Sequence, residues 1–125
     1  MAATEDLKYS KDHEWVRVDS EGVATIGVTA FAAGQLGDVV YVDLPEEGTE
    51  LTAGSEMGEI ESTKSVSELY SPIDGTVLEA NAAVVDAPET VNASPFDEGW
   101  LVRVQFTELP ADLLDVDAYA ELTGA

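Results

Sequence analysis

The sequence predicts a small, mainly β domain, a barrel or sandwich of short strands, on three observations. Its 125 residues suffice for one hydrophobic core, so a single domain is expected over residues 1–125. Hydrophobic residues make up 45% of the chain, too large a share for a disordered polymer. The apolar residues recur in short β-branched runs between Gly, Pro and Asp turn signals, a pattern typical of consecutive strands.

Strands are predicted wherever β-branched residues cluster between turn signals. In chain order they are expected at residues 15–18, 23–28, 39–44, 55–61, 66–69, 76–79 and 101–106. The last of these strands alternates most clearly, with Val102 and Val104 on one face and Arg103 on the other. The Asp74-Gly75 pair is expected to turn the chain into the strand that follows it.

Helices are predicted at two places. Residues 29–37 form one short internal helix, because Thr29 can cap its start and Gly37 can adopt the left-handed conformation that ends a helix. Residues 107–125 form a packed C-terminal helical appendage, in which Pro110 suits the first turn. The tail side chains expected to face the body are Leu113, Leu114, Tyr119 and Leu122.

The chain is strongly acidic. It has 26 Asp and Glu against 5 Lys and Arg, a formal charge of -21, and the carboxylates are spread along its whole length. Such a surface repels nucleic acids and anionic membranes, so neither is expected as a partner. Near molar salt the Debye length falls to about 3 Å and this self-repulsion is screened. The composition therefore favours a halophilic, salt-accumulating cytosol over an acidic protein of an ordinary cell.

Residue counts limit the available chemistry. The absence of Cys excludes disulfides and thiolate metal sites, and a single histidine, His13, excludes a multi-histidine metal site. His13 is expected to be a structural residue of the first strand. The start of the chain lacks an apolar secretory segment and an Arg-rich presequence, so a cytoplasmic location is expected.

Lys64 lies between two expected strands, with Ser and Thr on both sides that suit a tight turn. A lysine at the tip of such a turn points outward. On residue types and spacing alone, the simplest interpretation is an ordinary surface lysine beside Glu61 and Glu68. Exposed pairs of this kind contribute only about 0 to 1 kcal/mol.

The segment around Lys64 nevertheless resembles the modification hairpin of the biotinyl/lipoyl carrier family. Its surroundings are similar to one branch, the glycine cleavage system H-protein family. The resemblance is carried, in family order, by Tyr9 and by residues 11–16, 24–29, 35–45, 58–68, 70–75, 91–92, 94–96 and 99–101. It implies a barrel-sandwich hybrid of the lipoyl/biotinyl-carrier type. Residues 30–34 depart from the usual family pattern.

The resemblance implies that Lys64 carries lipoic acid as its cofactor, joined by an amide to the ε-amine. The implied partners are a P protein (a pyridoxal-phosphate glycine decarboxylase), a T protein (an aminomethyltransferase), an L protein (a dihydrolipoamide dehydrogenase) and a lipoate-attaching enzyme. The chain would shuttle the aminomethyl group of glycine from P to T and electrons to L. It is then a carrier and not an enzyme, and its tether keeps the labile group near its targets.

The same resemblance implies that the loaded arm folds back against its own domain. The positions that match its polar contacts are Glu14 and Glu68, with Asp12 as a further candidate. Carboxylates there would hold a cationic amine by charge-assisted hydrogen bonds. The alternative is that all three are ordinary surface carboxylates.

Other carriers fit less well. A lipoyl domain of a 2-oxo acid dehydrogenase typically has Asp-Lys-Ala at this point, and a biotin carrier has Met on both sides, whereas Thr63 and Ser65 flank Lys64. An H-like lipoyl scaffold that relays lipoate to other enzymes needs the same exposed lysine and stays open. Catalysis by the chain itself is not supported, because the sequence has no serine-nucleophile motif and no phosphate-binding loop.

Overall fold

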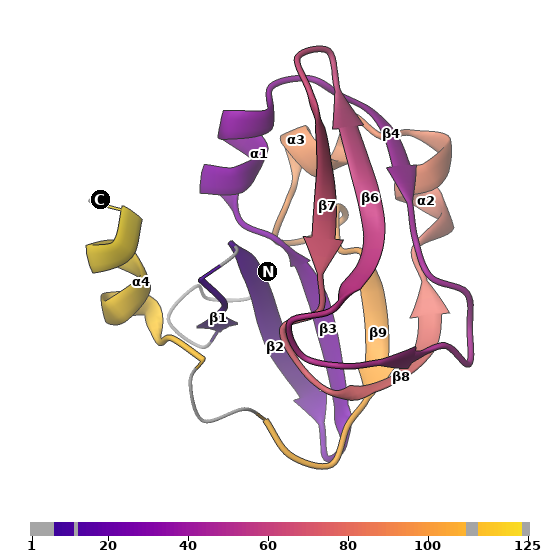
Figure 1. Ribbon diagram of the computed structural model, residues 1–125, viewed down its shortest axis with the longest axis vertical. Helices are drawn as coiled ribbons and strands as arrows, with labels where there is room; N and C mark the ends of the chain where they lie inside the picture. The colour runs from indigo at the N-terminus through magenta and orange to yellow at the C-terminus, as the bar shows by residue number, and fades with distance from the viewer. Residues whose placement is uncertain (1–6, 12, 110–112, 124–125) are drawn as a thin grey trace.

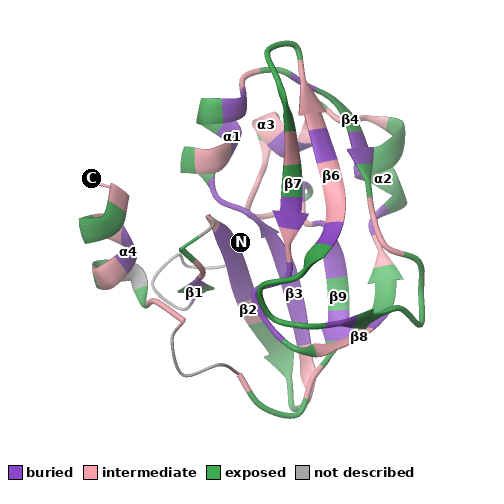
Figure 2. Cartoon of the chain, in the orientation of Figure 1, coloured by how far each residue is buried: buried purple, intermediate pink, exposed green. Residues whose placement is uncertain are grey.

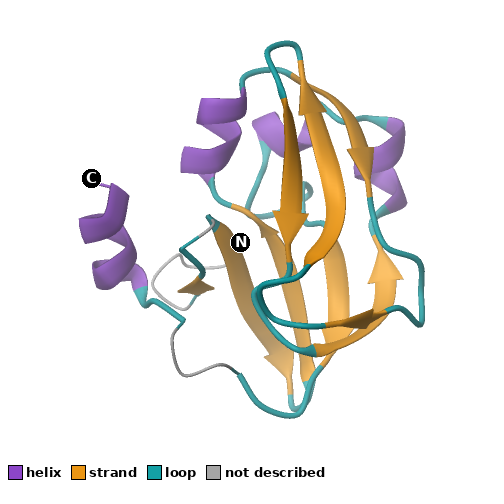
Figure 3. Ribbon diagram, viewed as in Figure 1, coloured by secondary structure: helices purple, strands orange, loops and turns teal. Residues whose placement is uncertain are grey.

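Two β-sheets enclose the core, and short helices flank them (Figure 1, Figure 3). The computed structural model describes residues 7–11, 13–109 and 113–123. The strands are β1 Lys8–Tyr9, β2 Glu14–Ser20, β3 Val23–Val28, β4 Val39–Asp43, β5 Glu50–Leu51, β6 Glu56–Ser62, β7 Val66–Tyr70, β8 Gly75–Ala80 and β9 Val102–Gln105. The helices are α1 Ala30–Leu36, α2 Ala82–Asp86, α3 Thr90–Ala93 and α4 Val116–Thr123.

One sheet has six strands in the order β1-β2-β3-β9-β8-β5, and the other has three in the order β4-β6-β7. All the strand pairs are antiparallel. The β6–β7 hairpin belongs to the smaller sheet, and its tip projects at the top of the molecule beside α1 (Figure 1). The mainly β fold expected from the sequence is therefore confirmed.

The core lies between the sheets, where alternate strand residues are buried (Figure 2). In β9, Val102 and Val104 are fully buried whereas Arg103 is exposed, as the sequence alternation predicts. A second cluster gathers aromatic side chains on the outer side of β2 under the C-terminal tail. It consists of Leu7, Tyr9, Trp15 and Tyr119, with Phe96, Trp100 and Leu114 partly buried against them.

The internal helix is confirmed as α1. Thr29 caps it, because its Oγ1 accepts a hydrogen bond from the Ala32 backbone N–H at 3.2 Å. Gly37 follows its last turn with φ 79° and ψ -154°, a conformation that residues with a Cβ rarely adopt. The helix therefore ends where the sequence predicts.

Two further helices, α2 and α3, were not predicted from the sequence. They are five and four residues long, too short to show a helical period. Asn81 starts α2 by accepting a hydrogen bond from Ala83 N–H, and its own amide donates to the backbone oxygens of Glu98 and Trp100. Tertiary partners thus help to select α2.

The sequence predicts a turn at Asp74-Gly75, and this prediction is wrong for Gly75. Gly75 opens β8 and pairs with Leu51, and its φ is not positive. A Cβ there would collide with Val104 Cγ1 and the backbone oxygen of Gln105, so close packing requires glycine.

The tail is helical over a shorter range than predicted. Residues 110–112, which include Pro110, lie outside the described residues, and Leu114 forms an antiparallel bridge with Tyr9 instead of a helical turn. Helix α4 packs through Tyr119, which is 8% exposed, whereas Leu122 is 51% exposed and does not face the body. Among the described residues, no helix is long and apolar enough to cross a membrane.

Candidate functional site

Lys64 lies at the exposed tip of the β6–β7 hairpin. The hydroxyl of Ser62 organises the turn, since its Oγ accepts from the backbone N–H groups of Lys64 at 3.2 Å and Ser65 at 3.1 Å. The Ser62 N–H donates to the Ser65 backbone oxygen at 2.8 Å. Among the described residues, no ion pair involves Lys64, so the surface-pair interpretation with Glu61 or Glu68 is not supported.

The hairpin tip rests on the loop that follows α1. The backbone N–H of Thr63 donates to the backbone oxygen of Asp38 at 3.1 Å. The Lys64 side chain passes over Gly37, where a Cβ atom would come within 3.0 Å of Lys64 Cε. The loop thereby supports the lysine stem, and Lys64 as a whole is exposed.

Asn92 in α3 holds this loop in place. Its Oδ1 accepts from the Val39 N–H at 2.9 Å, and its Nδ2 donates to the backbone oxygen of Gly37 at 2.7 Å. A longer bond of 3.4 Å reaches the backbone oxygen of Ala33. One amide therefore joins the end of α1 to the start of β4, directly below the hairpin tip.

A cleft of about 560 Å³ begins next to Lys64 and runs between β7 on one side and α1 with the start of β2 on the other. This volume lies in the range of small-molecule sites. Its lining consists of Lys11, His13, Glu14, Val28, Ala32, Gln35, Leu36, Ile60, Ser65, Ser67, Glu68, Leu69 and Tyr70.

The structure brings Glu14 and Glu68 to this cleft from opposite walls. Glu14, the first residue of β2, is only 2% exposed and accepts a hydrogen bond from Ser10 Oγ at 2.6 Å. Glu68 on β7 is exposed and accepts from the Tyr70 hydroxyl at 2.6 Å. Asp12, the third predicted carboxylate, lies outside the described residues.

His13 lies in the cleft wall just before β2, not within the first strand as expected. Its backbone has a positive φ of 68°. Its Nδ1 is 2.9 Å from the hydroxyl oxygen of Tyr119, which also lies 2.7 Å from Thr29 Oγ1. Burial raises the pKa of Tyr119 above its ordinary value, the Thr29 hydrogen bond lowers it, and the nearby Glu14 carboxylate raises it.

Sequence reasoning missed Ser62, Asn92 and Tyr119 as supports of the site. Ser62 carried a usable signal, because serine before a tight turn commonly bonds its own backbone. The partners of Asn92 and Tyr119 are more than 50 residues away in the chain, so no local pattern identifies them.

The two sheets and the hairpin lysine together define a small sandwich of the lipoyl/biotinyl-carrier type. A family model described as "Glycine cleavage H-protein" matches residues 7–124. The chain belongs to this glycine cleavage H-protein family.

Individual relatives agree over the full length. The chain is 54% identical to a glycine cleavage system H protein of Streptomyces avermitilis, with all of both chains covered. It is also 54% identical to that of Thermobifida fusca, over 98% of this chain and 97% of the relative. The crystal structure of a glycine cleavage system H protein from Mycobacterium marinum superposes with a TM-score of 0.93 at 40% identity, covering 98% of this chain and 100% of that one.

Proposed function

We propose that this chain is the lipoyl carrier of a glycine cleavage system and that Lys64 is its attachment residue. Membership of the family over residues 7–124 supports a role in the glycine cleavage system. The exposed position of Lys64 in the hairpin supports its assignment as the attachment residue. The described lysines are Lys8, Lys11 and Lys64: Lys8 lies in β1, Lys11 lies in the turn between β1 and β2, and Lys64 lies at the tip of the β6–β7 hairpin, the segment that carries the family resemblance. The position of Lys64 is the observation that carries the proposal.

The residues around Lys64 fit a covalent arm. Its amine takes part in no ion pair among the described residues, so acylation breaks no existing salt bridge. Ser62 and the backbone of Asp38 hold the tip rigidly enough to present the amine to a modifying enzyme. When attached, lipoic acid supplies a cyclic disulfide that can accept and release the aminomethyl group of glycine.

The cleft beside Lys64 fits the resting place of such an arm. It begins at Ser65, and its deeper part offers the buried carboxylate of Glu14. We propose that Glu14 accepts charge-assisted hydrogen bonds from a cationic amine, with Glu68 at the opposite wall. Asp12 stays a candidate for the same role. Exclusion of water by the walls would then slow hydrolytic loss of the carried group.

We further propose the P, T and L proteins and a lipoate-attaching enzyme as partners, with the chemistry carried out by those enzymes and not by this chain. A cytoplasmic location stays a prediction. The alternative function, a scaffold that relays lipoate to other enzymes, needs the same lysine. Transfer of lipoate from this protein to another lipoyl protein would favour the relay.

The test is modification followed by reconstitution. The protein is incubated with lipoate and a lipoate-attaching enzyme, and intact mass with peptide mapping locates the product. We expect one lipoyl amide on Lys64 and glycine-dependent NADH formation when P, T and L proteins are added. Lys64→Arg should abolish both, whereas Lys8→Arg, an exposed lysine on β1, should leave both unchanged. Modification elsewhere, or turnover by Lys64→Arg, contradicts the assignment.

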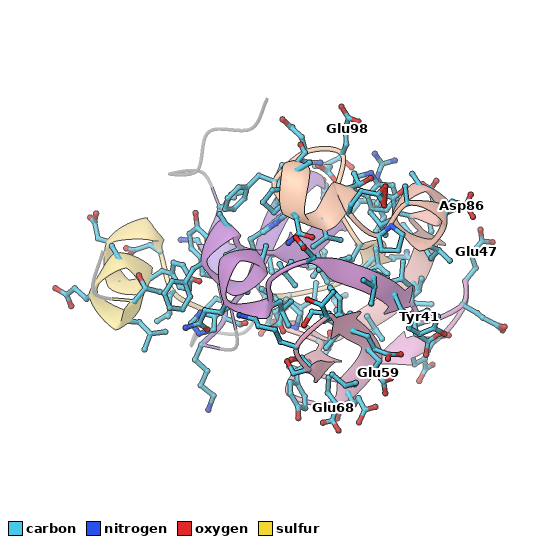
Figure 4. The ribbon with its side chains drawn as sticks, turned by 90° about the horizontal axis from the view of Figure 1, so that it is seen from above. Tyr41, Glu47, Glu59, Glu68, Asp86 and Glu98 are labelled. Atoms are coloured by element: carbon cyan, nitrogen blue, oxygen red, sulfur yellow. The ribbon has the colours of Figure 1, made fainter. Side chains whose placement is uncertain are left out.

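We also propose that the protein works in a salt-rich cytosol. Carboxylates point outward from several sides of the molecule, including Glu98, Asp86, Glu47 and Glu59 (Figure 4). The described residues form only two ion pairs, Arg17 with Asp19 and Arg103 with Glu79, so most of this charge is unbalanced. The unfolding midpoint should rise steeply with KCl, and a midpoint indifferent to salt contradicts this proposal.

A further inference from the structure

Tyr119 connects the C-terminal helix to the arm cleft. Its hydroxyl oxygen lies 2.7 Å from Thr29 Oγ1 and 2.9 Å from His13 Nδ1, and its ring stacks on Tyr9 with centroids 4.5 Å apart. The side chain is only 8% exposed. Hence Tyr119 in the C-terminal helix contacts two residues, His13 and Thr29, from the N-terminal part of the chain. The function proposed for the cleft assigns no part to Tyr119.

The two partners of Tyr119 belong to different parts of the cleft wall. His13 itself lines the cleft and precedes the buried Glu14. Thr29 caps α1, whose residues Ala32 and Gln35 also line it. The Thr29 N–H also donates to the His13 backbone oxygen at 3.0 Å. The Tyr119 hydroxyl therefore ties together the start of β2 and the start of α1.

The order of protons in this chain of hydrogen bonds follows from the donors available. Thr29 Oγ1 accepts from the Ala32 N–H, and the Tyr119 oxygen is the acceptor that the described residues offer its proton, so we assign the Thr29 proton to that bond. The Tyr119 proton is then left for His13 Nδ1, which must be unprotonated to accept it. In a neutral His13 ring, this order places the ring proton on Nε2. If the Tyr119 hydroxyl instead donated to Thr29 Oγ1, the buried Thr29 hydroxyl would find no acceptor for its own proton among the described residues.

We propose that Tyr119 is a positioning residue for the arm cleft, whose hydroxyl fixes the tautomer and place of His13 and so the wall that receives the loaded arm. This inference rests on the proposed function, because it assigns the tail helix a part in protecting the carried group. His13 has a positive φ of 68°, and a residue in this conformation needs neighbours that hold it. Tyr119 supplies such a contact from outside the cleft.

Anchoring of the tail does not by itself require the hydroxyl. The stack on Tyr9 and the paired backbone bonds between Tyr9 and Leu114, at 2.8 and 2.7 Å, already attach the tail to β1. A phenylalanine at position 119 would keep the stack. Tyr119→Phe therefore removes the link to Thr29 and His13 while leaving the main packing in place.

The first measurement uses the unmodified full-length protein. His13 is the single histidine, so imidazole nitrogen resonances in an NMR spectrum belong to it without ambiguity. In the neutral form of the ring we expect the proton on Nε2, and a clear shift of the Nδ1 resonance in Tyr119→Phe as its hydrogen bond is lost. A proton on Nδ1 in the parent, or an unchanged Nδ1 resonance in the variant, overturns the proposal.

The second measurement uses protein lipoylated on Lys64 and loaded by P protein with glycine. We expect formaldehyde and ammonia to leak from Tyr119→Phe about fivefold faster than from the parent, the effect of losing one hydrogen bond. Leu114→Ala is the matched control, because it weakens the tail packing without touching the Tyr119 hydroxyl. Its leakage should match that of the parent.

The outcomes separate this inference from the proposed function. Failure to lipoylate Lys64 contradicts the proposed function, and it does so without involving Tyr119. Equal leakage from Tyr119→Phe and the parent overturns the positioning role, as does equally fast leakage from Leu114→Ala, which would reduce Tyr119 to a tail anchor. Unfolding curves of both variants establish that each is folded at the assay temperature.

Discussion

The side chain of Lys64 lies across Gly37, the residue that ends α1. A Cβ atom at position 37 would come 3.0 Å from Lys64 Cε and 3.6 Å from its Nζ. Gly37 also has φ 79° and ψ -154°, a region that is accessible almost only to glycine. The same residue thus ends the helix and gives the lysine stem a surface to rest on.

Gly37→Ala should therefore damage both stability and presentation of the lysine. We expect the free energy of unfolding to fall by about 1 to 3 kcal/mol because of backbone strain. Lipoylation should also slow, since the new methyl group displaces Lys64. Chemical unfolding and a lipoylation time course measure the two effects. Gly34→Ala is the control: apart from its chain neighbours and the backbone of α1, nothing lies within 4 Å of its Cβ position, and the substitution should stabilise the protein by about 0.5 to 1 kcal/mol.

Ser62→Ala should loosen the hairpin tip. Its hydroxyl accepts from the backbone N–H groups of Lys64 and Ser65, so its removal should cost about 1 kcal/mol of unfolding free energy. The more direct readout is faster amide hydrogen exchange at Lys64. The control is Thr63→Ala, which removes a neighbouring exposed hydroxyl and keeps the bond from the residue 63 N–H to Asp38. In this variant, amide exchange at Lys64 should stay at the parental rate. Equal protection in both variants would contradict this role for Ser62.

Asn92→Ala should destabilise the support below the tip. Its amide satisfies the Val39 N–H and the Gly37 backbone oxygen, and leaving these unpaired should cost about 2 to 3 kcal/mol in thermal or chemical unfolding. Asn92→Asp should recover only part of this loss, because a carboxylate can accept from Val39 but cannot donate to Gly37. Full recovery would mean that the donor half of the amide is unimportant.

Neutralising Glu59 should stabilise the protein at low salt. Asp43, Glu59 and Glu68 lie directly opposite one another across β4, β6 and β7, and like charges so placed repel. We expect Glu59→Gln to gain about 0.5 kcal/mol in dilute buffer, and the gain should vanish in about 1 M KCl. The control is Glu47→Gln, which makes the same charge change in the loop between β4 and β5, away from these three carboxylates. It should raise the free energy of unfolding by less than Glu59→Gln does.

The protein should lose stability at alkaline pH through Tyr119. Burial raises the pKa of this phenol above its ordinary value of 10.0, so folding favours the protonated form. The contribution of the protonated Tyr119 phenol to the free energy of unfolding is fully present below pH 10.0 and is lost as the pH rises through the raised pKa. Unfolding curves across this range should show the loss in the parent and in Tyr41→Phe, an exposed tyrosine, but a smaller loss in Tyr119→Phe.

Much of the site's local structure was predictable because its signals are short-range. The caps of α1 lie at Thr29 and Gly37, where side-chain chemistry and backbone freedom indicated them. Lys64 lies at a bend because the strands on either side end there. Glu14 and Glu68 came from the family resemblance, and only the folded chain shows that they face one cleft from opposite walls.

The sequence by itself determined seven of the nine described strands, the position of the internal helix and the lysine at a bend, because alternation, capping and turn chemistry act between near neighbours. Strands β1 and β5 were not predicted, because two residues are too few to show alternation. The tertiary structure alone decided that Gly75 begins a strand, that Leu114 pairs with Tyr9, and that Tyr119 meets His13 and Thr29. These outcomes depend on which surfaces come together across the two sheets. Partners separated by 90 and 106 residues leave no periodic trace in the chain that joins them.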